Sequence, residues 1–119
     1  MPYADGFLLP VPKDKIDSYR EMARTCGALW REYGALEYRE CIADDIKPGK
    51  LTSFPQAVML EPEETVIFAW IVYESRAKRD EVNDKVMNDP RMKEMMDPAK
   101  FPFDGKRMMY GGFEMLVDL

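Results

Sequence analysis

Histidine is absent from this 119-residue sequence, and its absence restricts the available chemistry more than any other feature of the composition. A chain without histidine forms no Ser-His-Asp triad, no Cys-His pair and no His-ligated zinc, iron or haem site. Catalysis would have to rely on Asp, Glu, Tyr, Lys, Arg, Trp or bound water. We therefore expect no metal site and no cofactor.

Cysteines and long apolar runs are also scarce. Cys26 and Cys41 are too few for a disulfide framework or a zinc set, so we expect reduced thiols. The longest apolar run, Val66–Tyr73, is far shorter than the ~18 residues that a membrane-spanning helix needs. Met1–Gly6 lacks the basic start of a signal peptide. These features predict a cytoplasmic protein without a membrane partner.

Blocks of basic residues are missing as well, and the formal net charge is −5. Nucleic-acid binding depends largely on neutralised phosphates, so we expect no nucleic-acid partner. The sequence does contain enough apolar residues for a core, since 46% of its residues are hydrophobic and 33% are charged. Its length and composition predict one domain over residues 1–119.

Helical and strand patterns alternate along the chain. One apolar stripe predicts a helix at Lys13–Tyr33. Ser75 suits the N-cap of a second helix that ends before Pro90. Four strands are expected at Tyr3–Leu9, Leu36–Ala43, Thr65–Tyr73 and about Lys106–Val117, with a short helical piece at Pro90–Met96.

The order of these elements is β-α-β followed by β-α-β, which is the order of the ferredoxin-like fold. Pro10 and Pro12 are expected to end the first strand, because proline interrupts a hydrogen-bonded ladder. An extended insertion is expected at about residues 44–60, between the second and third strands. We therefore predict an α+β domain whose antiparallel sheet carries helices on one face.

The strand Thr65–Tyr73 is apolar on both faces. Ile67, Ala69 and Ile71 line one face, and Val66, Phe68, Trp70 and Val72 line the other. Helices of a ferredoxin-like domain cover only one face of the sheet, so the second face needs another cover. The simplest cover is a two-fold partner. We predict a homodimer in which this strand belongs to the core or to the dimer face.

The last strand contains Gly111 and Gly112, flanked by Tyr110 and Phe113. An RNA-recognition strand would place two aromatic residues two positions apart, on one face. Tyr110 and Phe113 are three positions apart and would point to opposite faces of a regular strand. A phosphate-binding loop would be followed by a helix. We expect the glycines to allow a bulge, a sharp twist or close packing.

Two carboxylates, Asp5 and Glu40, lie in apolar strands. If Glu40 is on the helix-covered face, it must be paired or neutralised. One interpretation is a general base in a pocket. The other is a structural ion pair, with Arg39 and Arg107 as candidate partners, or a strand end near solvent.

Five segments of the chain are distinctive. They are DGFLLPVPKDK (5–15), LWREYGALEY (29–38), PGKLTSFPQAV (48–58), VNDKVMNDP (82–90) and DPAKFPFDGKRMMYGGF (97–113). Together they resemble the YbaA-like family of bacterial proteins of unknown function, over essentially the whole chain. The resemblance implies a dimeric α+β barrel, in which two ferredoxin-like sheets pack face to face. No established activity comes with the family, so the resemblance supplies no catalytic residues.

Two functions remain open. The first is a small-molecule-binding or cofactor-independent enzyme-like protein, with a pocket between sheet and helices for a small organic ligand. Candidate pocket residues are Asp5, Tyr38, Glu40, Trp70 and Tyr110. The second is a structural or regulatory homodimer that binds a protein partner without catalysis.

Overall fold

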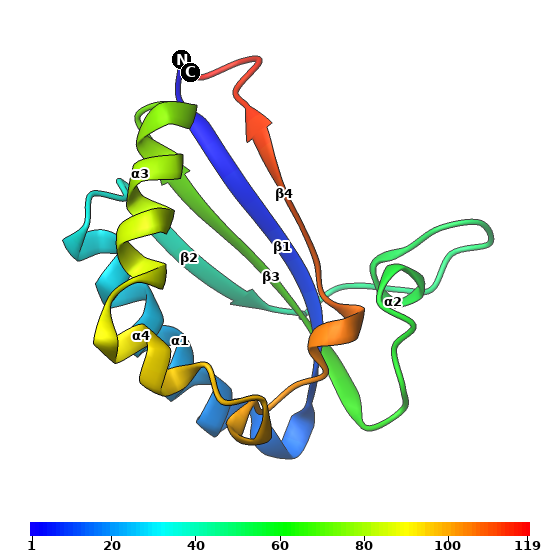
Figure 1. The fold of residues 1–119 in the computed structure, drawn as a ribbon. Helices are drawn as coiled ribbons and strands as arrows, with labels where there is room; N and C mark the ends of the chain where they lie inside the picture. The colour runs from blue at the N-terminus through cyan, green and yellow to red at the C-terminus, as the bar shows by residue number, and fades with distance from the viewer.

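The computed structural model describes residues 1–119 as a four-stranded antiparallel sheet that carries helices on one face (Figure 1). The strand order is β2-β3-β1-β4, which is that of the predicted ferredoxin-like fold. The strands are β1 (Tyr3–Pro12), β2 (Glu37–Ile42), β3 (Glu64–Tyr73) and β4 (Met109–Glu114). The helices are α1 (Ile16–Glu32), α2 (Phe54–Ala57), α3 (Arg76–Met87) and α4 (Pro90–Met95), with 3-10 turns at Lys13–Lys15, Pro98–Lys100 and Gly105–Arg107.

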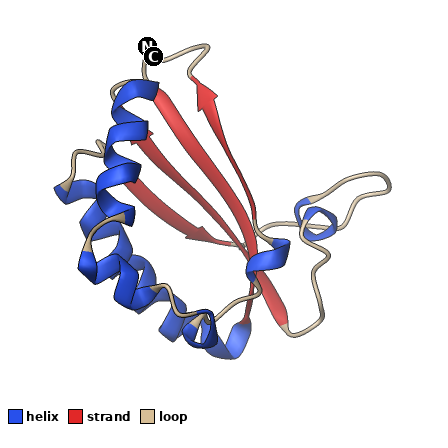
Figure 2. Ribbon diagram, in the orientation of Figure 1, coloured by secondary structure: helices blue, strands red, loops and turns tan.

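The core lies between the sheet and helices α1, α3 and α4, which form a second layer (Figure 2). The apolar stripe of α1 faces the sheet and buries Tyr19, Ala23 and Leu29. Ser75 caps α3 as predicted, because its side chain accepts a hydrogen bond of 3.1 Å from the Lys78 N–H. None of the helices is both long enough and apolar enough to cross a bilayer.

Strand β1 continues through both prolines, so the prediction that they end it is wrong. Pro10 pairs with Val66 of β3, and the pairing extends to Pro12. The pairing of β1 with β4 stops at Leu8, so the rest of β1 has a free edge. The backbone N–H of Lys13 donates to the Glu63 carbonyl, on the β3 side of β1. Because backbone groups point to alternate sides along a strand, the nitrogens of Pro10 and Pro12 point toward the free edge. A proline costs no ladder hydrogen bond there.

Strand β4 is shorter than the predicted Lys106–Val117. Asp104 caps the turn Gly105–Arg107 by accepting from the Lys106 N–H at 3.0 Å, so the strand begins only at Met109. Its glycines lie in regular register, with Gly111 opposite Gly6 and Gly112 opposite Asp5. The pair therefore makes no bulge. Close packing is the explanation for Gly112, since a Cβ there would lie 2.7 Å from Cε2 of Tyr3.

Residues 43–63 leave the sheet between β2 and β3 and form an arm. The arm projects on the side away from α1, α3 and α4 (Figure 1). It contains α2, a helix that the sequence did not predict, which is capped by Ser53 and tolerates Pro55 in its first turn. Leu51 is 92% exposed on the arm, and the Phe54 ring packs edge-on against Phe68 of β3 at 6.2 Å.

Strand β3 sends its side chains to the two faces as predicted. Ile67, Ala69 and Ile71 are buried on the face that the helices cover. Phe68 and Trp70 lie on the opposite face, which α1, α3 and α4 do not cover and which Phe54 of α2 touches at Phe68. We call this second surface the bare face; its apolar residues are Phe68, Trp70 and Val72 of β3, Leu8 of β1, and Met109 and Phe113 of β4, and β2 adds the charged Glu37 and Arg39.

Replacing Gly112 should destabilise the protein. The Cβ of Gly112→Ala would collide with the buried Tyr3 side chain, and overpacking of this kind costs about 1–3 kcal/mol of unfolding free energy. Gly105→Ala is the control, because a Cβ there meets no atom within 4 Å. Urea unfolding followed by circular dichroism measures both changes. Equal stability of the two variants would contradict the close approach.

Candidate functional site

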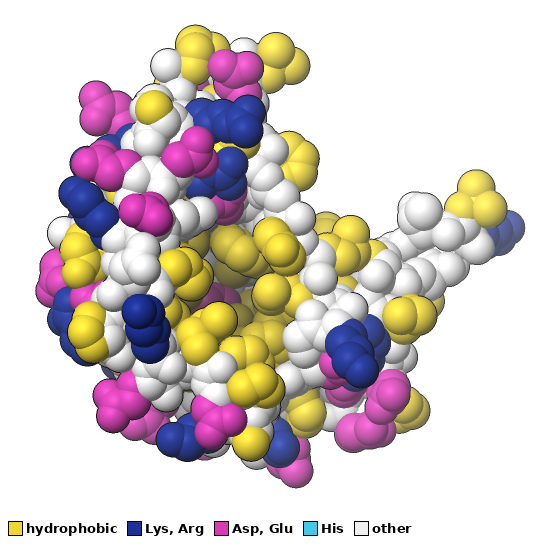
Figure 3. Space-filling view, in the orientation of Figure 1, with side chains coloured by type: hydrophobic (Ala, Val, Ile, Leu, Met, Phe, Trp, Pro, Cys, Tyr) yellow, Lys and Arg dark blue, Asp and Glu magenta, His cyan; other side chains and the backbone are white.

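A cavity of about 640 Å³ lies between the sheet and the helical layer. It opens as a hollow with hydrophobic walls in the space-filling view (Figure 3). Twenty-three residues line it and 17 of them are hydrophobic. This volume and this apolar lining are typical of sites for small organic ligands.

The walls of the cavity are methionines and aromatic rings. Six methionines line it, from α1, α3, α4 and the segment before β4: Met22, Met87, Met92, Met95, Met96 and Met108. The Phe7 ring stacks on Tyr110 with centroids 6.3 Å apart, and Phe101 stacks on Phe103 at 5.5 Å. Methionine side chains adapt their shape, so this wall can fit ligands of differing outline.

One polar cluster of the cavity surrounds Glu40. The alternation of β2 sends Tyr38 and Glu40 to the helix-covered face, and Tyr19 reaches them from α1. The Tyr19 hydroxyl donates to Glu40 Oε1 at 2.6 Å, and the Tyr38 hydroxyl donates to Oε2 at 2.7 Å. Each carboxylate oxygen therefore accepts one hydrogen bond from a phenol. Each can accept one more, because a carboxylate oxygen has two lone pairs.

The protonation of this cluster follows from burial and from the Glu40 charge. Burial raises the pKa of Tyr19 and of Tyr38 far above the ordinary value, and the adjacent Glu40 carboxylate raises both further. Both phenols therefore stay protonated as donors. Burial, with Glu40 as a second cause, also raises the pKa of the Cys26 thiol to about 11, so this cavity residue is not a thiolate at neutral pH.

A small residue on α1 makes room for the cluster. A Cβ on Gly27 would lie 2.6 Å from Cδ1 of Tyr38, so the absence of a side chain lets the ring approach the helix closely at this point. The same ring lies 6.2 Å from the ring of Trp30. Both contacts come from α1, so this one helix positions the Tyr38 ring.

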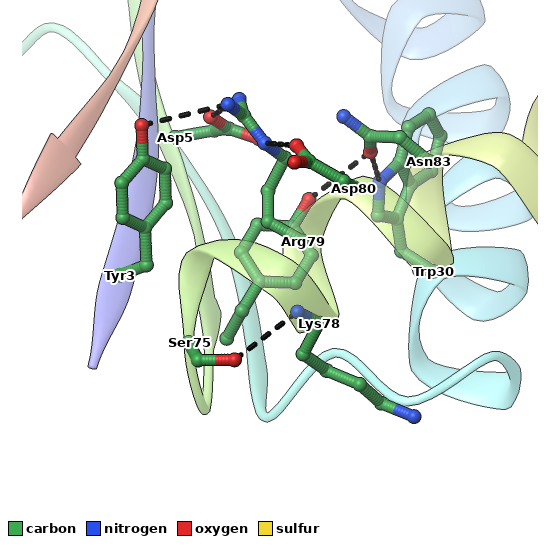
Figure 4. A network of polar contacts seen from close by, with 9 residues as sticks. Tyr3, Asp5, Trp30, Ser75, Lys78, Arg79, Asp80 and Asn83 are labelled. Atoms are coloured by element: carbon green, nitrogen blue, oxygen red, sulfur yellow. Dashed lines mark hydrogen bonds and ion pairs between the residues drawn. The ribbon is translucent and has the colours of Figure 1, made fainter. Parts of the chain in front are cut away.

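A second polar cluster lies in the same cavity and is centred on Arg79 (Figure 4). Its guanidinium donates to Asp5 Oδ1 at 2.7 Å and to Asp80 Oδ1 at 2.8 Å, and it lies over the Tyr3 ring at 4.9 Å. Burial raises the pKa of Asp5, and the Arg79 charge opposes that rise. For Asp5, the ion-pair interpretation is therefore the one the geometry supports.

Asn83 extends this second cluster toward α1. Its Oδ1 accepts from Trp30 Nε1 at 3.0 Å and from the Tyr73 hydroxyl at 3.3 Å. Three elements, α1, β3 and α3, are joined through one amide oxygen. No buried side-chain polar atom in the structure is left without a hydrogen bond.

The structure brings four of the five candidate pocket residues to one cavity. Asp5, Tyr38, Glu40 and Tyr110 line it. Trp70 does not, because the pleat of β3 turns it to the bare face, where its Nε1 donates to Glu37 at 3.0 Å. The candidate cationic partners of Glu40 are elsewhere too. Arg39 lies on the bare face with Trp70, and Arg107 binds Glu64 at 2.6 Å.

Sequence reasoning missed the partners that define both clusters. Tyr19 is part of the predicted apolar stripe, where a phenol is a signal of a buried polar contact. Arg79 and Asn83 lie four residues apart on α3, so they share one side of that helix. Their meeting with Asp5 and Trp30 depends on tertiary packing.

The raised pKa of Cys26 should appear in its alkylation kinetics. In a Cys41→Ser variant, the rate with iodoacetamide should keep rising toward about pH 11, whereas a free cysteine levels off soon above its pKa of about 8.5. Mass spectrometry of the alkylated protein gives the rate, and circular dichroism checks the fold at each pH. A plateau at the pH of free cysteine would show that Cys26 is not desolvated.

Proteins of similar sequence match the chain over nearly its full length. The chain is 52% identical over 118 residues to the uncharacterized protein YbaA of Escherichia coli (strain K12), covering 99% of both chains. The corresponding protein of Shigella flexneri has the same identity and coverage.

Solved structures resemble the chain at much lower identity. A dimeric ferredoxin-like protein from an uncultured marine organism superposes with a TM-score of 0.62 at 9% identity, covering 100% of this chain and 98% of that one. An uncharacterized NIPSNAP domain protein from Burkholderia xenovorans gives 0.61 at 12% identity, covering 97% and 95%. A family model of proteins of unknown function matches residues 2–105. The resemblance to the YbaA-like family is confirmed, and the chain belongs to the DUF1428 family of proteins of unknown function.

Proposed function

We propose that this protein is a homodimer that binds a small, largely apolar organic molecule in the cavity between its helices and its sheet. One observation carries the proposal: a cavity of about 640 Å³ with apolar walls contains a carboxylate held by two phenols. A few placed polar groups in an apolar pocket are the usual composition of a ligand site.

The residues of the cavity support binding and, at most, proton transfer. Cys26 is protonated at neutral pH and is a poor nucleophile. Glu40 is the cavity group suited to accept a proton from a bound molecule, since Arg79 already neutralises Asp5. The phenols of Tyr19 and Tyr38 would orient Glu40 in such a step. A cofactor-independent proton transfer is therefore the reaction that this arrangement supports.

The bare face supports the homodimer. Phe68 is 47% exposed and Phe113 is 64% exposed, and together with Trp70 they form an apolar surface that a lone subunit would leave in water. The solved neighbour from the marine organism is itself described as dimeric. The arm of residues 43–63 projects on the same side, beside Phe68. We propose that the bare faces of two copies pack together.

A second candidate function is a regulatory homodimer that binds a protein partner. The observation in its favour is the exposure of large apolar residues along the arm: Leu51 is 92% exposed and Met59 is 69% exposed. This candidate needs no ligand in the cavity. The ligand experiment therefore separates the two.

Some apolar metabolites should raise the melting temperature and slow the alkylation of Cys26, because that thiol lines the cavity. A thermal-shift screen in the Cys41→Ser background identifies stabilising compounds, and iodoacetamide labelling then locates them. A compound that stabilises the protein without protecting Cys26 binds elsewhere. A library in which no compound does both would favour the regulatory homodimer.

Wild-type protein should have twice the mass of one chain in size-exclusion chromatography with light scattering. Phe113→Asp should yield monomers, because it places a charge among the exposed apolar residues of the bare face. Leu36→Asp is the matched control: Leu36 is 55% exposed but lies outside the bare face, so this variant should stay dimeric. A monomeric wild type at micromolar concentration would contradict the proposal.

A further inference from the structure

The charges inside the cavity do not balance. Three ionisable carboxylate or guanidinium side chains line it: Asp5, Glu40 and Arg79. Arg79 is bound to Asp5 at 2.7 Å, and both side chains are largely buried, with 18% and 8% exposed. Asp5 therefore has a cationic partner inside the cavity, although Arg79 also binds the exposed Asp80. The uncompensated charge of the cavity is the carboxylate of Glu40.

Glu40 has no cationic partner anywhere in the chain. None of the ion pairs within 4 Å includes it, and its only side-chain partners are the two phenols. An outer groove of about 530 Å³ shares Tyr19, Tyr38 and Glu40 with the cavity, and three arginines of α1 line that groove. Those arginines are Arg20, Arg24 and Arg31, and none reaches the carboxylate. An unpaired carboxylate in apolar surroundings gains most from a counter-ion.

Two tyrosines contact this unpaired carboxylate, and two further aromatic rings pack against those tyrosines. Tyr19 and Tyr38 contact it directly, Trp30 lies beside Tyr38, and the Phe103 ring meets Tyr19 edge-on at 5.8 Å. The faces of such rings attract organic cations. A carboxylate and several rings at one end of an apolar cavity therefore favour a positive head group, while methionines accommodate an apolar body.

We infer that the ligand of this cavity is a lipophilic organic cation, an ammonium ion with an aromatic or alkyl body, whose charged nitrogen lies against Glu40. This inference rests on the proposed function, since it names the class of molecule that the cavity takes. It places the ammonium among the rings of Tyr19, Tyr38 and Trp30. The apolar body lies along the methionine wall toward Tyr110.

Three naphthalene derivatives of similar shape test the charge preference. Naphthylmethylamine is a cation at neutral pH, naphthalenemethanol is neutral and naphthoic acid is an anion. Isothermal titration calorimetry on the full chain should find the amine bound at least about tenfold more tightly than the alcohol, and the acid bound most weakly. Protection of Cys26 from iodoacetamide verifies that the amine occupies the cavity rather than the acidic surface.

Glu40→Gln removes the charge but keeps an oxygen that accepts from a phenol. The variant should lose the preference for the amine and bind the alcohol about as well as the wild type does. Glu21→Gln, an exposed carboxylate on α1, is the control for net charge and should keep the preference. The order of the three ligands on the wild-type protein is decisive even if Glu40→Gln fails to fold.

The outcomes separate this inference from the proposed function. Binding of the alcohol or the acid as tightly as the amine, with protection of Cys26, would overturn the cation preference and leave the ligand cavity intact. If Glu40→Gln binds the amine as tightly as the wild type does, the cation preference is likewise overturned and the ligand cavity remains. If none of the three molecules binds the wild type or protects Cys26, the cation inference is wrong, and the metabolite screen decides separately whether the cavity takes any ligand.

Discussion

A carboxylate that lines an apolar cavity needs hydrogen-bond donors. Glu40 takes its two donors from two different elements of the fold. Tyr19 of α1 and Tyr38 of β2 each donate to one of its oxygens. The two phenols meet there only because Gly27 lets α1 approach the Tyr38 ring. Glu40 therefore ties α1 to the edge strand β2, next to the apolar contacts that α1 makes with the sheet.

The fold was predictable because its signals are local. The stripe of α1, the Ser75 cap and the two apolar faces of β3 follow from residue spacing alone. The errors also have local causes. Pro10 was expected to end β1, but the edge of a sheet tolerates proline where no partner needs its N–H. The turn before β4 forms because Asp104 caps it, which shortens the predicted strand.

The site was predictable only in part. The alternation of β2 is enough to put Tyr38 and Glu40 on one face, two positions apart. The choice between the two faces of β3 cannot be made from periodicity, and for that reason Trp70 was expected in the pocket. The phenol of Tyr19 comes from another element, 21 residues away in sequence from Glu40. Contacts of this kind depend on how α1 is rotated against the sheet.

The concentration of methionine in the cavity wall ties the site to the oxidation state of its surroundings. Six of the ten methionines in the chain line this single cavity. Two of them, Met87 and Met96, are 44% and 49% exposed, so peroxide in solvent has access to them. Oxidation to the sulfoxide turns an adaptable apolar side chain into a polar one. Oxidation of these two residues would therefore make part of the cavity wall polar.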